Sequence, residues 1–281
     1  MQNNLPHGKV ILSGEHAVVY GKLALAASIG LGVTARIVSE GSEANQSVIV
    51  EKAIEVAGGD MGLRVGVESE IPVGAGLGSS AAVSAAVIVS VRNYLEQPIT
   101  SKEELYDLVM ECETVAHGNP SGIDAAVVVY GGLIAFTKGS PIEKLSIEKP
   151  LELLLVDTGK PIETTKEMVE LVSQVGNRDK IIELIGKLSI EVKDKLVLGK
   201  DVGEMLNKNG LLLEELGVVG MIAKKLSDEL RKIGASVKVT GAGGVKEGSG
   251  MLLVRHNDLN VVRKYLDSRN ISHYSTKIGG R

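Results

Sequence analysis

The sequence predicts an α+β fold in two domains, and three stretches of the chain carry that prediction. Residues 63–71 alternate between apolar and polar side chains and run into a glycine-rich turn at 72–78. Ser79 to Tyr94 is then rich in Ala and Val, which predicts a buried helix. The C-terminal half of the chain, from residue 151 on, predicts the order β-α-β-β-α-β, which is typical of a ferredoxin-like domain.

The remaining N-terminal elements follow from local patterns. Apolar and β-branched runs predict strands over residues 10–12 and 33–38, and a short helix is expected over 49–58. Ser101 is followed three residues later by Glu104, which is the spacing of a capping box at a helix N-terminus. The chain between 138 and 150 becomes charged and proline-bearing, so we place the domain boundary there, giving domains 1–145 and 146–281.

The C-terminal domain divides at its glycine turns. Apolar runs predict its strands, and amphipathic stretches predict its helices. The expected elements are a strand over 151–156, a helix over 218–233, a strand over 236–240, a glycine loop over 241–244, a strand over 250–255, a helix over 257–268 and a strand over 271–276.

Composition excludes several classes of function. The chain has 281 residues, a formal net charge of -4, 2% aromatic residues and no tryptophan. A nucleic-acid-binding protein would show a basic surface and aromatic stacking platforms, so we expect no nucleic-acid partner. The N-terminus lacks the pattern of a signal peptide, and no apolar run has the length of a membrane span, so we expect a cytoplasmic protein without a membrane partner.

The single cysteine, Cys112, cannot form an internal disulfide, which favours a reducing compartment. A free cysteine has two interpretations, a nucleophile or a small buried apolar residue. Cys112 lies on the apolar face of a predicted helix, so we favour the buried interpretation.

The turn at 72–80, Pro-Val-Gly-Ala-Gly-Leu-Gly-Ser-Ser, predicts a phosphate site. Glycines allow backbone N–H groups to point into one concavity, and the following helix adds its positive dipole end. The residues predicted to bind phosphate are Gly74, Ala75, Gly76, Leu77, Gly78, Ser79, Ser80 and Ala81.

Three other interpretations of this turn are weighed. The Lys of a Walker A loop is missing. Gly76 to Ala81 fits a loose dinucleotide fingerprint, with Glu96 about 20 residues on, but Glu96 is expected at the end of a helix and not at a strand tip. A turn needed only for packing is the third interpretation, and the strand before and apolar helix after the turn make it less favoured.

Three further segments carry groups suited to chemistry. The loop Thr240 to Gly244 is either a hairpin turn or the second half of an anion site. Lys9 precedes a strand, and the pair Glu15-His16 follows it. Asp124 enters an apolar run, where a carboxylate is costly unless it is paired, and Lys9 is its candidate partner.

Taken together, these motifs resemble the GHMP kinases, in order at 8–21, 72–82 and 238–250. Within that superfamily, residues 14–21 and 117–124 resemble the mevalonate kinase family, and the modest length of the chain resembles its archaeal type. The resemblance implies an N-terminal domain like ribosomal protein S5 domain 2, a C-terminal ferredoxin-like domain, and an active site in the cleft between them. It also implies ATP-dependent phosphorylation of (R)-mevalonate in isoprenoid biosynthesis, with Mg²⁺ and a possible homodimer.

The resemblance implies a role for each matching residue. Asp124 matches the catalytic aspartate and Lys9 the lysine that pairs with it. Glu113 and Ser80 match the Mg²⁺ ligands, with Ser79 as the alternative serine. The positions implied near mevalonate are Lys9, Glu15, His16, Asp124, Thr165 (with Thr164 as alternative) and Ala242, and those beside the transferred phosphate are Thr240, Gly241, Gly243 and Gly244.

The chain departs from the family pattern at three places. His7 stands where proline is usual, Gly32 where arginine is frequent, and Val245-Lys246-Glu247 interrupts the third glycine motif. Two alternatives therefore stay open: another GHMP kinase such as a phosphomevalonate kinase, and a GHMP-like sensor without catalysis. Lys9, Glu113 and Asp124 together argue against a sensor, which has no need of all three.

Overall fold

The computed structural model describes residues 5–38, 46–60, 62–118 and 120–279. The chain divides into two compact units that interleave along the sequence. The first unit consists of residues 1–9, 28–73 and 78–131, and the second of residues 10–27, 74–77 and 132–281. The predicted domain boundary at 145 and the cleft between the two domains stay predictions.

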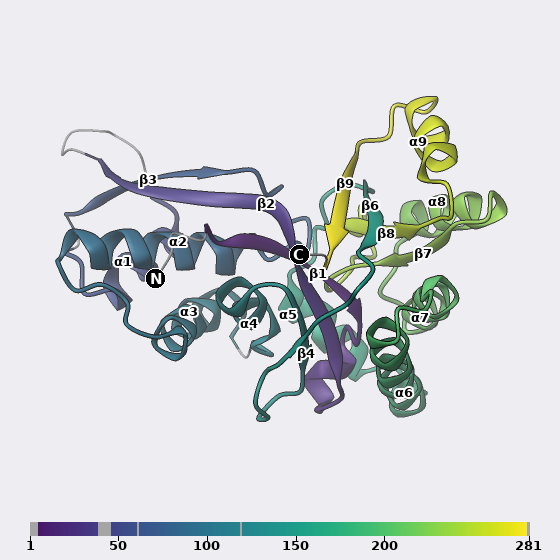
Figure 1. Ribbon diagram of the computed structural model, residues 1–281, viewed down its shortest axis with the longest axis horizontal. Helices are drawn as coiled ribbons and strands as arrows, with labels where there is room; N and C mark the ends of the chain where they lie inside the picture. Colours follow the sequence, from purple (N-terminus) through teal and green to yellow (C-terminus); the bar gives the residue numbers. More distant parts are fainter. Residues whose placement is uncertain (1–4, 39–45, 61, 119, 280–281) are drawn as a thin grey trace. The chain divides into compact units, whose positions relative to one another are not determined.

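The first unit is a layer of helices on a strand pair. β2 (Ala24–Val38) pairs in its C-terminal half with β3 (Arg64–Ser69), antiparallel, from Val33 opposite Ser69 to Val38 opposite Arg64. Figure 1 shows the helices of this unit on one side of that pair. They are α1 (Val48–Val56), α2 (Ser79–Tyr94), α3 (Lys102–His117) and α4 (Ile123–Tyr130).

Small apolar residues allow these helices to pack closely. Ala81, Ala85 and Ile88 of α2 are fully buried in one core with residues of α1, α3 and α4. The cap predicted for α3 is present, since the Ser101 hydroxyl accepts from the Glu104 amide at 3.0 Å. The Glu104 carboxylate in turn accepts from the Thr100 amide at 2.9 Å. Burial of this apolar face holds the N-terminal ends of α2 and α4 in fixed positions.

The second unit contains an antiparallel four-stranded sheet in the order β7-β8-β6-β9. Its strands are β6 (Leu151–Asp157), β7 (Ser236–Val239), β8 (Met251–Arg255) and β9 (His273–Ile278). Helices lie between β6 and β7, and a single helix lies between β8 and β9. This order and connectivity confirm the predicted ferredoxin-like pattern.

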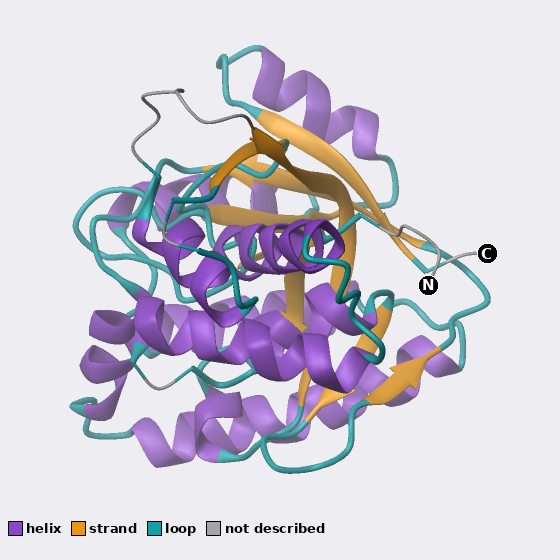
Figure 2. Ribbon diagram, turned by 90° about the vertical axis from the view of Figure 1, so that its left-hand side faces the viewer, coloured by secondary structure: helices purple, strands orange, loops and turns teal. Residues whose placement is uncertain are grey.

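The other elements of the second unit complete its core. Buried apolar residues of β6, β7 and β8 form one cluster with residues of the helices and with Ala17. The helices are α5 (Thr165–Ser173), α6 (Arg178–Val197), α7 (Gly203–Glu215), α8 (Met221–Lys232) and α9 (Leu259–Asp267). This unit also contains the short helix η1 (Ala17–Tyr20) and the strands β4 (Leu133–Phe136) and β5 (Glu143–Leu145). Figure 2 shows helices and strands by colour, the mixture expected of the α+β class.

Several elements differ from their predicted extent, and β2 and α8 show why. β2 continues through Gly30 and Gly32, where only 33–38 was expected as strand, because its N-terminal half pairs with β4 from Ala24 opposite Phe136 to Ala27 opposite Leu133. α8 begins at Met221 and not at Val218, because Val219 instead bridges to Gly244. None of the helices in the part of the chain that the structure describes could span a bilayer.

Candidate active site

Lys9 and Asp124 form an ion pair within the first unit. β1 (His7–Ser13) carries Lys9, and Asp124 lies in the first turn of α4. The Lys9 Nζ is 3.2 Å from Asp124 Oδ1, with the lysine side chain 3% exposed and the aspartate 29% exposed. The pairing predicted from the sequence is confirmed, and the carboxylate keeps one side toward solvent.

Glycine at position 78 makes this pair possible. Gly78 caps the N-terminus of α2 in the left-handed region, with φ of 72°. A Cβ at this position would lie 2.8 Å from Lys9 Cγ and 3.7 Å from Asp124 Oδ2. Gly122, with φ of 91°, caps α4 in the same way. Two helix N-termini, which favour negative charge, therefore begin beside the lysine and the aspartate.

Glu113 and Ser80 join this group. Glu113 on α3 is 2% exposed. Burial, together with the charge of Asp124, raises the pKa of Glu113 to about 7, and the Ser80 hydroxyl and Lys9 oppose that shift. The structure thus brings together four predicted residues, Lys9, Ser80, Glu113 and Asp124, within one unit.

This group of side chains suits a small divalent cation whose remaining ligands come from a bound phosphate and from water. Among the described residues, no three His, Cys, Asp or Glu side chains gather into a metal site. Mg²⁺ does not require one, since it is usually held by one or two carboxylates together with substrate phosphates and water. The Glu113 carboxylate, the Ser80 hydroxyl and the Asp124 carboxylate are hard oxygen donors of that kind.

The raised pKa of Glu113 predicts a pH-dependent stability in metal-free protein. On folding, the pKa of Glu113 rises from its ordinary value of 4.5 to about 7, so the folded state binds this proton more tightly than the unfolded chain does. The protonated Glu113 therefore stabilises the folded state by roughly 3 kcal/mol below pH 4.5, and this stabilisation is lost as the pH rises through 7. Denaturant unfolding in EDTA should show the wild type losing more stability than Glu113→Gln between pH 5 and 8.

The exposed neighbour Glu111 provides the matched control, because Glu111→Gln removes a carboxyl from the same helix without removing a buried one. Its stability should follow that of the wild type at both pH values. Parallel curves for the wild type and Glu113→Gln would contradict the pKa shift.

In the second unit, the glycine turn lies against the loop after β7. A Cβ on Gly76 would be 2.9 Å from the Thr240 carbonyl oxygen, and one on Gly241 would be 2.9 Å from the Gly76 carbonyl oxygen. A Cβ on Gly250 would be 2.8 Å from the Ala75 carbonyl oxygen. Two predicted motifs, 74–77 and 240–244, therefore meet through backbone atoms, and only glycine permits the approach.

Lys160, in the loop after β6, lies over the glycine turn. The space that a Cβ on Gly74 would occupy is filled by the Lys160 side chain, with Cε at 2.6 Å and Cδ at 3.2 Å. The loop is fixed by the Thr158 hydroxyl, which donates to the Gly250 carbonyl at 2.7 Å. The Gly250 amide donates back to the Gly159 carbonyl at 3.0 Å. A cation is thereby supplied to a turn that has no Walker lysine.

The pair Glu15-His16 is anchored to the same loop. The Nε2–H of His16 donates to the Ala242 carbonyl at 3.0 Å. Burial lowers the pKa of His16 to about 4, so its ring is neutral near pH 7. His16 has φ of 58°, an unusual backbone for a residue with a side chain. Glu15 is 1% exposed and forms an ion pair with Lys238 of β7.

The departure from the third motif has a local explanation. The amides of Val245 and Lys246 donate to the Glu163 carboxylate at 3.3 and 3.1 Å. The Ser249 hydroxyl donates to the Gly244 carbonyl at 2.7 Å and accepts from the Gly220 amide at 2.9 Å. Side chains therefore close a loop that a run of glycines closes in the family pattern.

The other predicted residues lie in the glycine loop after β7 and at the starts of α2 and α5. Gly243 and Gly244 are buried, and Ser79 begins α2. Thr164 caps α5 with its hydroxyl in a capping box with Glu167, whereas Thr165 is the first helical residue and is exposed. Asn119 of the loop 117–124 lies outside the described residues.

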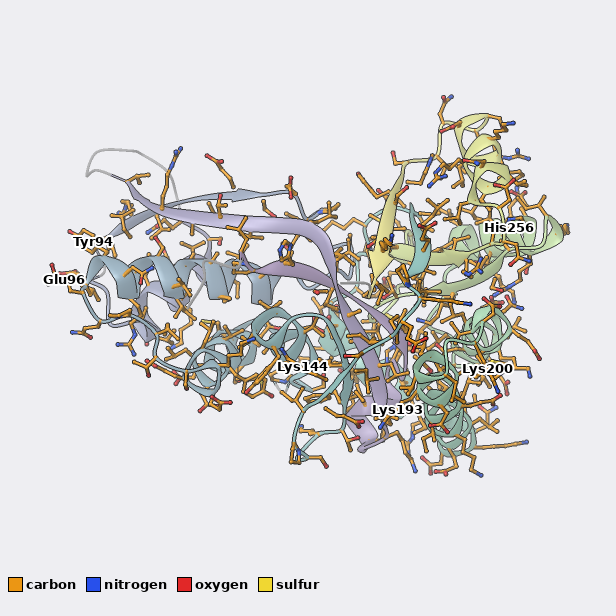
Figure 3. The ribbon with its side chains drawn as sticks, viewed as in Figure 1. Tyr94, Glu96, Lys144, Lys193, Lys200 and His256 are labelled. Atoms are coloured by element: carbon orange, nitrogen blue, oxygen red, sulfur yellow. The ribbon has the colours of Figure 1, made fainter. Side chains whose placement is uncertain are left out.

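Two alternatives weighed from the sequence lose support. Glu96 follows the C-terminal end of α2 beside Tyr94, as Figure 3 shows, and is not at the tip of a strand. Burial is the main cause that raises the pKa of Cys112 to about 11, so this buried thiol is a poor nucleophile. The prediction of a small buried cysteine is confirmed.

Two residues at the site escaped the sequence reasoning, Lys160 and Lys238. Lys238 alternates with valines in the strand Ser-Val-Lys-Val, a pattern that predicts an exposed side chain. One signal was available for Lys238, which stands at the first position of the third motif, 238–250, whereas no predicted motif lies beside Lys160. Such a signal is weak without the tertiary contacts.

The sequence resembles known proteins over most of its length. Residues 46–132 match the family of GHMP kinase N-terminal domains. A mevalonate kinase from Archaeoglobus fulgidus is 31% identical over 257 residues, covering 84% of this chain and 87% of the relative. One from Pyrococcus horikoshii is 35% identical over 285 residues, covering 84% of each.

Solved structures share the fold. The mevalonate kinase of Methanococcus jannaschii has a TM-score of 0.79 at 22% identity and covers 100% of both chains. That of L. major, in complex with R-mevalonate, has a TM-score of 0.80 at 21% identity and covers 98% of this chain and 95% of its own. These likenesses establish the GHMP kinase fold. The identities to the archaeal enzymes, at 31% and 35% over 84% of its length, show that the chain belongs to the mevalonate kinase family of the GHMP kinases.

Proposed function

We propose that this protein transfers the γ-phosphoryl group of ATP to the primary hydroxyl of (R)-mevalonate, giving ADP and (R)-5-phosphomevalonate. The observation that carries the proposal is the Lys9–Asp124 pair, at 3.2 Å, with Glu113 and Ser80 beside it. A phosphotransferase acting on an alcohol needs an oxygen acceptor for the hydroxyl proton and positive charge near the transferred group. Asp124 and Lys9 supply both.

Asp124 orients the alcohol and accepts its proton at a carboxylate oxygen. It lies in the first turn of α4, with the Lys9 ammonium 3.2 Å from its Oδ1. Most analyses of phosphoryl transfer favour a loose transition state, in which the nucleophile bears little charge until late. A carboxylate is then an adequate acceptor, and Lys9 stabilises the charge that develops on the phosphoryl oxygens.

Glu113 and Ser80 are the proposed holders of Mg²⁺. When bound with ATP, this ion neutralises the charge on the β- and γ-phosphates. Glu113 contributes a carboxylate that burial makes costly to leave without a cation, which suits it to that role. Ser80, at the second position of α2, adds a neutral oxygen without adding charge.

The glycine turn 74–77 and the start of α2 are the proposed phosphate-binding elements. Backbone N–H groups of the turn and the positive end of α2 favour the anionic chain of ATP. Residues Thr240 to Gly244, whose backbone contacts Gly76, are the proposed loop beside the transferred phosphate. Glu15, His16, Thr165 and Ala242 are proposed to lie on the mevalonate side. The cytoplasmic location and the homodimer rest on the sequence and on the resemblance alone.

Lys160 makes this phosphate site testable. Replacing Lys160 with Met keeps the aliphatic side chain over Gly74 and removes the ammonium. We expect the KM for ATP to rise about tenfold, with the KM for mevalonate changed little, because one cation near a polyphosphate is lost. Lys224→Met, an exposed lysine of α8, serves as the control. Equal KM values for ATP in the two variants would remove Lys160 from the phosphate site.

The proposed function is tested by ADP release, measured in a coupled assay with purified protein, ATP and Mg²⁺. Mevalonate, phosphomevalonate, galactose and homoserine are the acceptors to compare. We expect turnover with mevalonate and little with the other three. Preference for another acceptor would overturn the substrate assignment, and nucleotide binding without turnover on any of them would favour the sensor alternative.

A further inference from the structure

We propose that Lys238 is a positioning residue for mevalonate phosphorylation. Through its buried ion pair with Glu15, it holds the Glu15-His16 segment in place against the loop Thr240–Gly244. This inference rests on the proposed function, because it assigns the two segments to one substrate site. Lys238 is the first residue of the third motif, 238–250, but neither a role for it nor a partnership with Glu15 was predicted from the sequence.

Lys238 makes three polar contacts from a fully buried position. It lies on β7 and is 1% exposed. Its Nζ donates to the carbonyl of Ile11 at 2.9 Å and to that of Val239 at 2.8 Å, and it also donates to Glu15 Oε1. A lysine ammonium has three donors, and each of these three oxygens can accept from one of them. The ammonium is therefore held in one place.

An ion pair at this depth is a poor choice for stability alone. Removing two charges from water carries a penalty that their attraction repays only with good geometry and extra hydrogen bonds. An apolar pair of similar volume is often at least as stable. Retention of Lys238 and Glu15 in a core of apolar residues is better explained by the position that the pair fixes.

That position lies at the junction of two predicted motifs. Glu15 is followed by His16, whose ring donates to the Ala242 carbonyl at 3.0 Å. Ile11, which accepts from Lys238, donates its own amide to the Thr240 hydroxyl oxygen at 2.8 Å. Lys238 thus contacts both ends of the segment from Ile11 to Glu15 and precedes the loop that His16 contacts.

The role of Glu15 changes as a result. The family resemblance implies a position near mevalonate, but one carboxylate oxygen already accepts from Lys238. Glu15 therefore acts through its neighbour, by fixing the backbone at His16. The left-handed φ of 58° at His16 is a strained backbone that surrounding contacts must maintain, and the ion pair adjoins it.

The test compares single variants with a neutral double variant. Lys238→Met alone leaves a buried carboxylate without its ammonium, so we expect a large fall in Tm. Combining Lys238→Met with Glu15→Gln removes both charges and should restore most of that fall. We expect the restored double variant to retain a kcat/KM for mevalonate about tenfold below wild type, with the KM for ATP within about threefold.

Arg231→Met is the matched control, because it also removes an ion pair whose two side chains are largely buried. Arg231 of α8 pairs with Glu214 of α7 at 2.6 Å, with side chains 14% and 8% exposed, and neither was predicted at the site. We expect it to lower Tm while leaving the KM for mevalonate at the wild-type value. Lys238→Arg keeps the charge and should recover part of the kcat/KM lost in Lys238→Met.

The outcomes separate this inference from the proposed function. Wild-type protein that fails to phosphorylate mevalonate overturns the proposed function. Active wild type together with a stable double variant of wild-type kinetics overturns the positioning role and leaves the pair structural. Should the double variant fail to fold, Lys238→Arg and Glu15→Gln decide: a KM change for mevalonate several times that for ATP supports positioning, and equal changes refute it.

Discussion

Asp124→Asn should lower kcat for mevalonate phosphorylation by about 10²- to 10⁴-fold, the contribution typical of a positioned general base. The amide occupies the space of the carboxylate, but it neither accepts the hydroxyl proton nor balances the Lys9 ammonium 3.2 Å away. ATP binding should change little, because the glycine turn 74–77 is untouched. ADP release gives kcat, and titration with a fluorescent nucleotide gives the affinity for ATP.

Asp107→Asn is the control for this substitution. Asp107 is an exposed residue of α3, so its amide variant removes one negative charge away from Lys9. Its kcat should stay near the wild-type value. If Asp124→Asn also retained kcat within about tenfold, Asp124 would not be the proton acceptor.

Gly243→Ala should destabilise the fold by about 3 kcal/mol or more, since it adds a steric clash to a strained backbone. Gly243 has φ of 77°, and a Cβ there would lie 2.1 Å from the Val218 carbonyl oxygen and 3.1 Å from its carbon. Backbone atoms cannot turn aside as a flexible side chain can. The loop 240–244 or the segment before α8 would have to move, so activity should fall as well.

Gly217→Ala isolates the conformational part of that effect. Gly217 has φ of 79°, but a Cβ there would meet nothing within 4 Å. Its cost should be about 1 kcal/mol, from the left-handed backbone alone. Urea unfolding of the three proteins measures both values. Equal losses for the two variants would show that the loop yields to the new Cβ without resistance.

Local patterns account for much of the fold. Ser79 to Tyr94 was predicted as a helix and α2 has those ends, because small apolar residues and the glycine before them define both the buried face and the start. β2 was only half predicted. The strand begins at Ala24 and runs on through Gly30 and Gly32, and its first residues, Ala24 to Ala27, pair with β4, a contact that no local pattern contains.

The site divides in the same way. The pairing of Lys9 with Asp124 followed from the cost of a carboxylate at an apolar run, and the structure confirms it. The pairing of Lys238 with Glu15 did not follow, because an alternating strand with one lysine is ordinary for a half-exposed sheet. Only the full fold shows that this lysine is on a buried face. The roles of the predicted site residues await the variants described above.

The contacts of the segment 11–16 also bear on how the chain is made. Ile11 meets Thr240 across 229 residues and His16 meets Ala242 across 226. During synthesis, the segment 11–16 is one of the first parts of the chain to leave the ribosome, whereas its partners Thr240 and Ala242 are among the last residues to leave it. Contacts between residues so far apart in sequence form slowly, and until they form the chain exposes apolar surface. Chains truncated before β7 would lack every one of these partners, and the first motif would remain unassembled.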